Sequence, residues 1–118
     1  MIKEAIQTLL ALLNSGGERV IMLRDTVRQG GNYLLFSSLQ KEREISTLHF
    51  SLFIAGHTFL GNAEALIPRL SAFLEMLEEL RANPLPHYPS KLSVQEAHLK
   101  EVNTLFFYEV SIKLEIRQ

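Results

Sequence analysis

The segment TLFFYEVSIKLEI, residues 104–116, decides the fold of this chain. Every second position in it is apolar, and these positions are Phe106, Tyr108, Val110, Ile112, Leu114 and Ile116. Polar residues separate the later ones, namely Glu109, Ser111, Lys113 and Glu115. This alternation predicts a β-strand with one buried and one solvent-facing side. A strand of this length needs partner strands, so the preceding sequence must supply a sheet.

Three earlier segments are predicted to supply that sheet. They are the short apolar run Val20–Leu23, the segment Tyr33–Leu39, and the long segment Ile45–Phe59. In the third segment the apolar side chains of one face are Leu48, Phe50, Leu52 and Ile54, and the opposite face carries His49, Ser51, Phe53, Ala55 and His57. Because both faces carry apolar residues, we expect a central strand with partial cover on its second face, and a bulge or bend at Gly56.

Two helices are predicted to cover the sheet. Ile2–Leu13 has an apolar stripe at helical spacing and ends at residues 14–17, which include two glycines. Leu66–Leu80 has a second stripe, preceded by Asn62 as a helix cap, and Pro68 either lies in its first turn or kinks it. Residues 92–102 fit either a short helix begun by a capping box at Ser93 or a strand.

The sequence therefore predicts an α+β fold in one domain, residues 1–118. The expected order is α-β-β-β-α-β, with an antiparallel or mixed sheet of about four strands covered by the N-terminal helix and the long second helix. Strands that follow one another directly usually pair, so we expect the first three to form an antiparallel meander.

The composition excludes several classes of function. The net charge is −1, so no basic excess is present to neutralise nucleic-acid phosphates. The chain has no cysteine, which removes disulfides, thiol catalysis and zinc–thiolate sites. The N-terminus lacks the pattern of a signal peptide, and no apolar run approaches the ~20 residues of a membrane span. We expect no nucleic-acid or membrane partner and a protein that stays where it is made.

No residue pattern in the chain indicates catalysis. His49 and His57 share a strand face but would lie roughly 26 Å apart at ~3.3 Å per residue, too far to bind one metal ion. The carboxylates of Glu75, Glu78 and Glu79 fall on the polar side of the second helix, where they should remain solvated. We expect no enzyme activity, metal or cofactor.

The order of elements resembles one family of virus assembly proteins. The resemblance is carried by Ile2–Leu13, by His49–Ile54 followed by Leu66–Leu80, and by Phe107–Ile116. This arrangement is similar to the tail terminators, or tail-completion proteins, of long-tailed bacteriophages and prophages, of the minor tail protein U type and the Mu-like type. It covers most of the chain but includes no diagnostic motif, so it assigns no functional residue.

The resemblance implies a structural role without a cofactor. Such proteins form a ring, typically a hexamer, that caps the tail tube and joins it to the head. It would place this protein in the host cytoplasm and then in the virion tail, with itself, the tail tube and head-completion proteins as partners. The alternative is a small cytoplasmic adaptor or secretion-chaperone-like module that binds proteins.

Two charged segments are the candidate contacts between subunits. The first is the polar loop Asp25–Asn32 with its base, from which we select Arg24, Asp25 and Arg28. The second is the connection Gln40–Glu44, expected to be a solvated hairpin loop, from which we select Lys41, Glu42 and Arg43. Oppositely charged side chains in such segments can pair across a subunit boundary.

Overall fold

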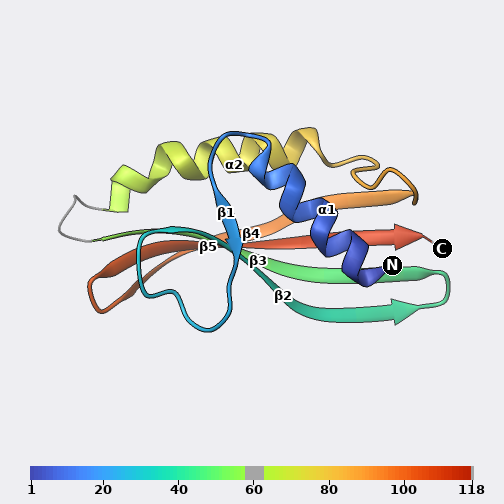
Figure 1. Cartoon of the computed structure of the whole chain (residues 1–118), viewed down its shortest axis with the longest axis horizontal. Helices are drawn as coiled ribbons and strands as arrows, with labels where there is room; N and C mark the ends of the chain where they lie inside the picture. Colours follow the sequence, from blue (N-terminus) through green and yellow to red (C-terminus); the bar gives the residue numbers. More distant parts are fainter. Residues whose placement is uncertain (58–62, 118) are drawn as a thin grey trace.

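The computed structural model describes residues 1–57 and 63–117, and these form two layers. One layer is a five-stranded sheet with the strand order β1-β2-β3-β5-β4. The other layer consists of two helices that lie on the same face of the sheet (Figure 1). The fold is therefore α+β, as the sequence predicts. The sheet has one strand more than expected.

The elements follow one another as a helix, three strands, a helix and two strands. Their bounds are α1 Ile2–Asn14, β1 Val20–Met22, β2 Gly31–Glu42, β3 Ile45–His57, the 3₁₀ helix η2 Ala63–Leu66, α2 Ile67–Glu79, β4 Ser90–Val102 and β5 Leu105–Arg117. Pro68 lies in the first turn of α2, where its missing N–H costs no helical hydrogen bond. The expected cap at Asn62 and the end of the third strand at Thr58 and Phe59 lie outside the described residues.

The pairing of the strands corrects two expectations and decides one alternative that the sequence left open. β1 runs parallel to β2, whereas β2 with β3, β3 with β5, and β4 with β5 are antiparallel, so the first three strands do not form an antiparallel meander. Residues 92–102 belong to strand β4 and not to a helix. β2 continues through Glu42, so the expected hairpin loop shrinks to a two-residue turn at Arg43 and Glu44.

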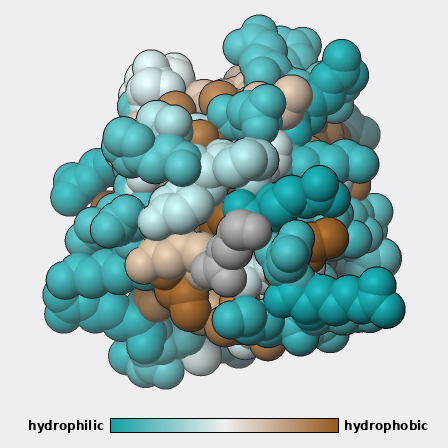
Figure 2. Space-filling model, turned by 90° about the vertical axis from the view of Figure 1, so that its right-hand side faces the viewer, coloured by the Kyte–Doolittle hydropathy of each residue, from teal (hydrophilic) through white to brown (hydrophobic). Residues whose placement is uncertain are grey.

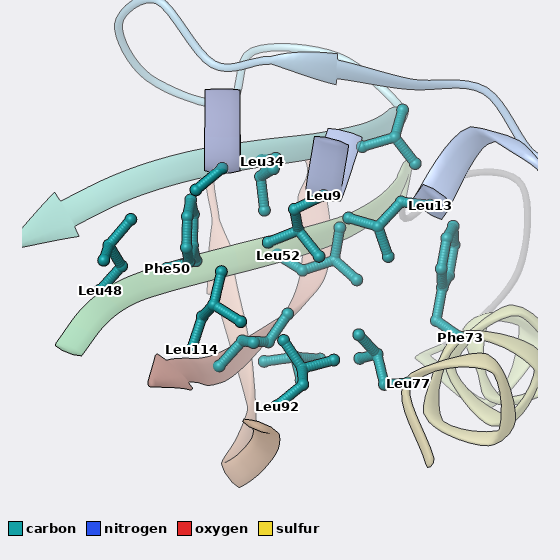
Figure 3. Packing of buried hydrophobic residues seen from close by; sticks show 14 of the residues in the cluster. Leu9, Leu13, Leu34, Leu48, Phe50, Leu52, Phe73, Leu77, Leu92 and Leu114 are labelled. Carbon is teal, nitrogen blue, oxygen red and sulfur yellow. The ribbon is translucent and has the colours of Figure 1, made fainter. Parts of the chain in front are cut away.

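The main core lies between the sheet and the helices (Figure 3). α1 contributes Leu9 and Leu13, and α2 contributes Phe73 and Leu77. The sheet contributes alternate residues of its central strands, and those that are fully buried include Leu48, Phe50, Leu52, Ile54, Val110, Ile112 and Leu114. The alternation that predicted the last strand is thus confirmed from Val110 to Ile116.

The opposite face of the sheet has a smaller apolar cluster near the start of β5. Phe107, Phe53, Tyr33 and Ala55 are buried there, and the rings of Phe53 and Phe107 meet edge to face with centroids 5.7 Å apart. Phe106 and Tyr108 are only half-buried. The expected single buried face therefore does not extend to the start of β5, because the loop after β1 covers the second face at this point.

The predicted irregularity of the third strand is not found at Gly56. The register shifts lie on its neighbours, between Phe36 and Ser38 in β2 and between Val94 and Glu96 in β4. Gly56 pairs in register with Phe106. A Cβ at Gly56 would approach the side chain of Leu66 within 2.9 Å, so the absent side chain makes room for the start of the second helix.

Candidate subunit interfaces

The loop between β1 and β2 holds the first set of predicted interface residues. Leu23 and Val27 pack on the second apolar cluster, and the hydroxyl of Tyr33 donates to the carbonyl oxygen of Gln29 at 3.1 Å. The loop is therefore anchored on the face of the sheet that the helices leave open. Between its two apolar anchors, Arg24 and Asp25 are exposed.

Arg28 and Asp25 already bind each other within this loop. Arg28 Nη2 lies 2.6 Å from Asp25 Oδ2, and both side chains are highly exposed. An exposed pair of this kind contributes little to folding stability. Its charges remain accessible to a neighbouring molecule.

The turn between β2 and β3 holds the second set. Lys41 pairs with Ser46 and Glu42 with Ile45, and Arg43 takes a positive φ of 57° to close the turn. All three predicted residues, Lys41, Glu42 and Arg43, are exposed. The end of the molecule seen in Figure 2, which contains this turn in Figure 1, is covered mainly by hydrophilic side chains.

The two predicted sets lie apart. Lys41, Glu42 and Arg43 lie at the end of β2, a strand from Gly31 to Glu42. β1 runs parallel to β2 with Met22 beside Leu34, so the loop that carries Arg24 and Asp25 starts beside the middle of this strand. The described molecule is elongated, with principal extents of 47 × 25 × 20 Å, and its long strands follow the longest axis (Figure 1). The six residues therefore form two separate surfaces, one on the loop that covers the open face of the sheet and one at the turn between β2 and β3.

The open face of the sheet carries a polar network that the sequence did not indicate. Glu109 Oε2 accepts a hydrogen bond from the hydroxyl of Ser51 at 2.9 Å, and Glu109 Oε1 lies 2.5 Å from Lys100 Nζ. The hydrogen bond from Lys100 is the main cause that lowers the pKa of Glu109 below its ordinary value, and the bond from Ser51 acts in the same direction against partial burial. This network links β3, β5 and β4 across the sheet.

A second unpredicted cluster ties α2 to the sheet. Arg69 donates to the carbonyl oxygens of Ala55 and Gly31 at 3.0 and 3.1 Å and to Asn32 Oδ1 at 2.6 Å. The buried amide of Asn32 donates in turn to the carbonyl oxygen of Arg19 at 3.0 Å. Because its guanidinium already donates hydrogen bonds to three oxygen atoms, we assign Arg69 a structural role. The sequence showed Asn32 only as a turn residue.

The two edges of the sheet differ in how they are closed. At the β1 edge, the side chain of Asn14 accepts from the N–H of Val20 at 2.8 Å and donates to its carbonyl oxygen at 2.9 Å. At the β4 edge, only the beginning of the strand is covered, where the N–H of Leu92 donates to the carbonyl oxygen of Arg81 and the N–H of Asn83 to that of Ser90. No described residue pairs with the outer side of Val94–Val102.

The uncovered part of β4 is exposed along its whole length. Leu99 and Val102 retain 47% and 48% of their accessible surface, and Val94 retains 37%. An unpaired strand edge presents N–H and C=O groups to any extended chain that approaches it. This edge, Val94–Val102, is called the β4 edge below.

Within 1–57 and 63–117, no three His, Asp, Glu or Cys side chains converge in a manner that would hold a metal ion. Neither helix among these residues is long and apolar enough to cross a bilayer. The three glutamates Glu75, Glu78 and Glu79 are exposed on α2, as the sequence predicts.

No protein-family model matches this chain, and no curated protein sequence matches it significantly.

Proposed function

We propose that this protein is a structural subunit of the tail-terminator kind, which assembles into a ring that caps a phage tail tube and takes part in joining the head. The observation that carries the proposal is the position of two exposed charged segments, Arg24–Arg28 and Lys41–Arg43, on two separate surfaces of an elongated molecule. A ring forms when one surface of a subunit meets a different surface of the next and the rotation closes. Two separate surfaces on one subunit suit such a contact.

The charges of the two segments are compatible with this contact. Each segment contains both acidic and basic side chains within a few residues, and in each they are exposed. Asp25 of one subunit can approach Lys41 or Arg43 of the next, while Arg28 approaches Glu42. Contacts between exposed charges weaken as salt rises, because the Debye length falls to about 3 Å at 1 M.

Sedimentation velocity at low and high salt tests the proposal. The wild-type chain is expected to form species larger than a dimer at low salt or on purified tail tubes, and Arg28→Glu is expected to reduce them. Arg81→Glu is the matched control, because Arg81 also forms an exposed i,i+3 pair, with Glu78 at 2.7 Å, but lies outside both segments. A strict monomer under every condition, including with tail tubes, would refute the ring.

The second candidate is a non-enzymatic adaptor or chaperone-like module, and the β4 edge favours it. An extended peptide can add to an unpaired edge as a further strand, held by main-chain hydrogen bonds. A chain that forms nothing larger than a dimer and does not bind tail tubes would support this candidate over the ring.

A further inference from the structure

In the described part of the chain, the β4 edge is open on its outer side over Val94–Val102. On the other side of the sheet, β1 pairs only with Asn32–Leu34, so among the described residues the outer side of β2 from Phe36 to Glu42 is also unpaired. The β4 edge differs in its charges: Glu96 and Lys100 lie on one face, four residues apart, so this edge can complement a second copy of itself. Such self-pairing takes place across a two-fold axis.

We propose that the β4 edge pairs antiparallel with the β4 edge of a second copy, with the two-fold axis at His98. In this register Glu96 lies opposite Lys100 of the second copy, and Lys100 opposite its Glu96. The pairing joins two five-stranded sheets into one continuous sheet. It goes beyond the proposed ring, because it uses neither of the two charged segments.

The side chains of β4 alternate between the two faces of the sheet, and this alternation restricts the registers in which two copies can pair. Directly opposite residues in an antiparallel pair point to the same side of the sheet, so the axis must pass through a residue. In β4, Glu96, His98 and Lys100 lie opposite Ser111, Glu109 and Phe107 of β5, all on the open face. Ala97 and Leu99 lie opposite Val110 and Tyr108, on the face of the helices.

Charge selects among the remaining registers. An axis at Glu96 or Lys100 places like charges opposite each other, which is destabilising. An axis at Leu99 places Lys100 opposite His98, with no carboxylate opposite the lysine. An axis at Ala97 places Lys100 opposite Val94, beyond the bulge. Only the axis at His98 places a lysine opposite a carboxylate, and it does so twice.

The apolar side chains fit the same register. Leu99, which is 47% exposed, lies opposite Ala97 of the second copy, and the two Leu99 side chains become diagonal neighbours. The small side chain of Ala97 leaves room for the leucine. The pairing therefore covers exposed apolar surface beside the outer end of the core.

The acid–base pairs would extend a network that already exists. Lys100 lies 2.5 Å from Glu109, and Glu96 lies 3.0 Å from Nε2 of His98 in the same strand. A lysine ammonium has three N–H donors, so Lys100 can bind Glu109 and the second copy's Glu96 together. Both carboxylates and the lysine lie on the open face, away from the helices.

Charge reversal tests the register. Sedimentation equilibrium should show a dimer of the wild-type chain, and Glu96→Lys or Lys100→Glu should each weaken it by roughly tenfold or more, because two attractive pairs become repulsive. The double variant Glu96→Lys/Lys100→Glu should restore dimerisation. Two outcomes would overturn the proposal: single variants that dimerise as strongly as the wild type, or a double variant that dimerises no more strongly than the single variants.

Cross-linking gives an independent readout. The chain has no cysteine, so His98→Cys introduces a single thiol on the axis. Opposite Cα atoms in antiparallel strands are about 4.5–5.5 Å apart, within the range of a disulfide. Mild oxidation should give a covalent dimer, whereas in the control Glu101→Cys the two thiols lie about six residues apart, ~20 Å, and should not cross-link. Equal cross-linking of both variants would refute the register.

The ring contact and the β4-edge dimer can be tested independently of each other. Arg28→Glu should reduce species larger than a dimer and leave the cross-linked yield of His98→Cys unchanged. Glu96→Lys should weaken the dimer contact while leaving any head-to-tail contact of the charged segments in place. An effect of Arg28→Glu on the cross-linked yield would contradict the assignment of the dimer to the β4 edge.

Discussion

Asn14, the last residue of α1, holds Val20, the first residue of β1, through two hydrogen bonds: its side chain accepts from the N–H of Val20 at 2.8 Å and donates to its C=O at 2.9 Å. A side-chain amide with one acceptor and one donor can replace the backbone of a neighbouring strand. The helix end thereby covers the outer side of β1 at Val20, while the outer side of β2 beyond β1 stays unpaired among the described residues.

Asn14→Ala should destabilise the protein by about 1–3 kcal/mol, because the two backbone groups of the buried Val20 lose their partners. Asn14→Asp keeps the acceptor for the N–H and loses the donor, so an intermediate loss is expected. Urea unfolding at neutral pH measures both variants. An alanine variant as stable as the wild type would show that water forms equally good hydrogen bonds with the N–H and C=O of Val20.

Ile112→Asp should destabilise the protein by several kcal/mol. Ile112 is 1% exposed between β3, β4 and the helices, and an unpaired carboxylate there would be costly. Lys113→Gln, one residue along on the open face, is the control and should change stability by less than about 0.5 kcal/mol. Chemical denaturation compares the two, and an aspartate variant that unfolds like the wild type would contradict the burial of this face.

Arg69→Met should cost about 2–3 kcal/mol, because two carbonyl oxygens and the side-chain oxygen of the buried Asn32 lose their donor. Arg69→Lys should recover only part of this loss, since one ammonium does not reproduce the planar fork of a guanidinium. Arg81→Met, at an exposed position, serves as the control in the same unfolding experiment. Equal stability of the Arg69 and Arg81 variants would argue against the structural role of Arg69.

Glu109→Gln should reduce stability at neutral pH and flatten its dependence on acid. The pKa of Glu109 in the folded protein is lowered, mainly by the hydrogen bond from Lys100, so its carboxylate stabilises the fold above the ordinary value of 4.5. This contribution is lost as the pH falls below about 4.5 and through the lowered pKa. The difference in unfolding free energy between wild type and variant should therefore shrink from pH 7 to pH 3.

Thermal or urea unfolding at several pH values measures that difference. Ser51→Ala removes the weaker of the two hydrogen bonds to Glu109 and should show a smaller change of the same sign. A difference that grows on acidification would contradict the lowered pKa.

The sequence by itself determined the features that depend on local periodicity. The alternation from Val110 to Ile116 set the buried face of β5, and the apolar stripes set the inner faces of α1 and α2. Period-two and helical patterns report which side of an element is buried, because the buried side must be apolar wherever the element packs. The charged segments at Arg24–Arg28 and Lys41–Arg43 were likewise recognised as exposed.

The tertiary structure alone decided the partners of each element. Residues 92–102 carry a local helix signal, yet they form β4 because the turn at Asn103, with φ of 56°, folds them back along β5 for a full strand length. The three acceptors of Arg69 lie 14 to 38 residues away in the sequence, and the parallel pairing of β1 and the bonds of Asn14 to Val20 likewise join different elements. Local pattern carries no information on such pairings, since many partners would satisfy the same backbone groups and only the packed sheet selects among them.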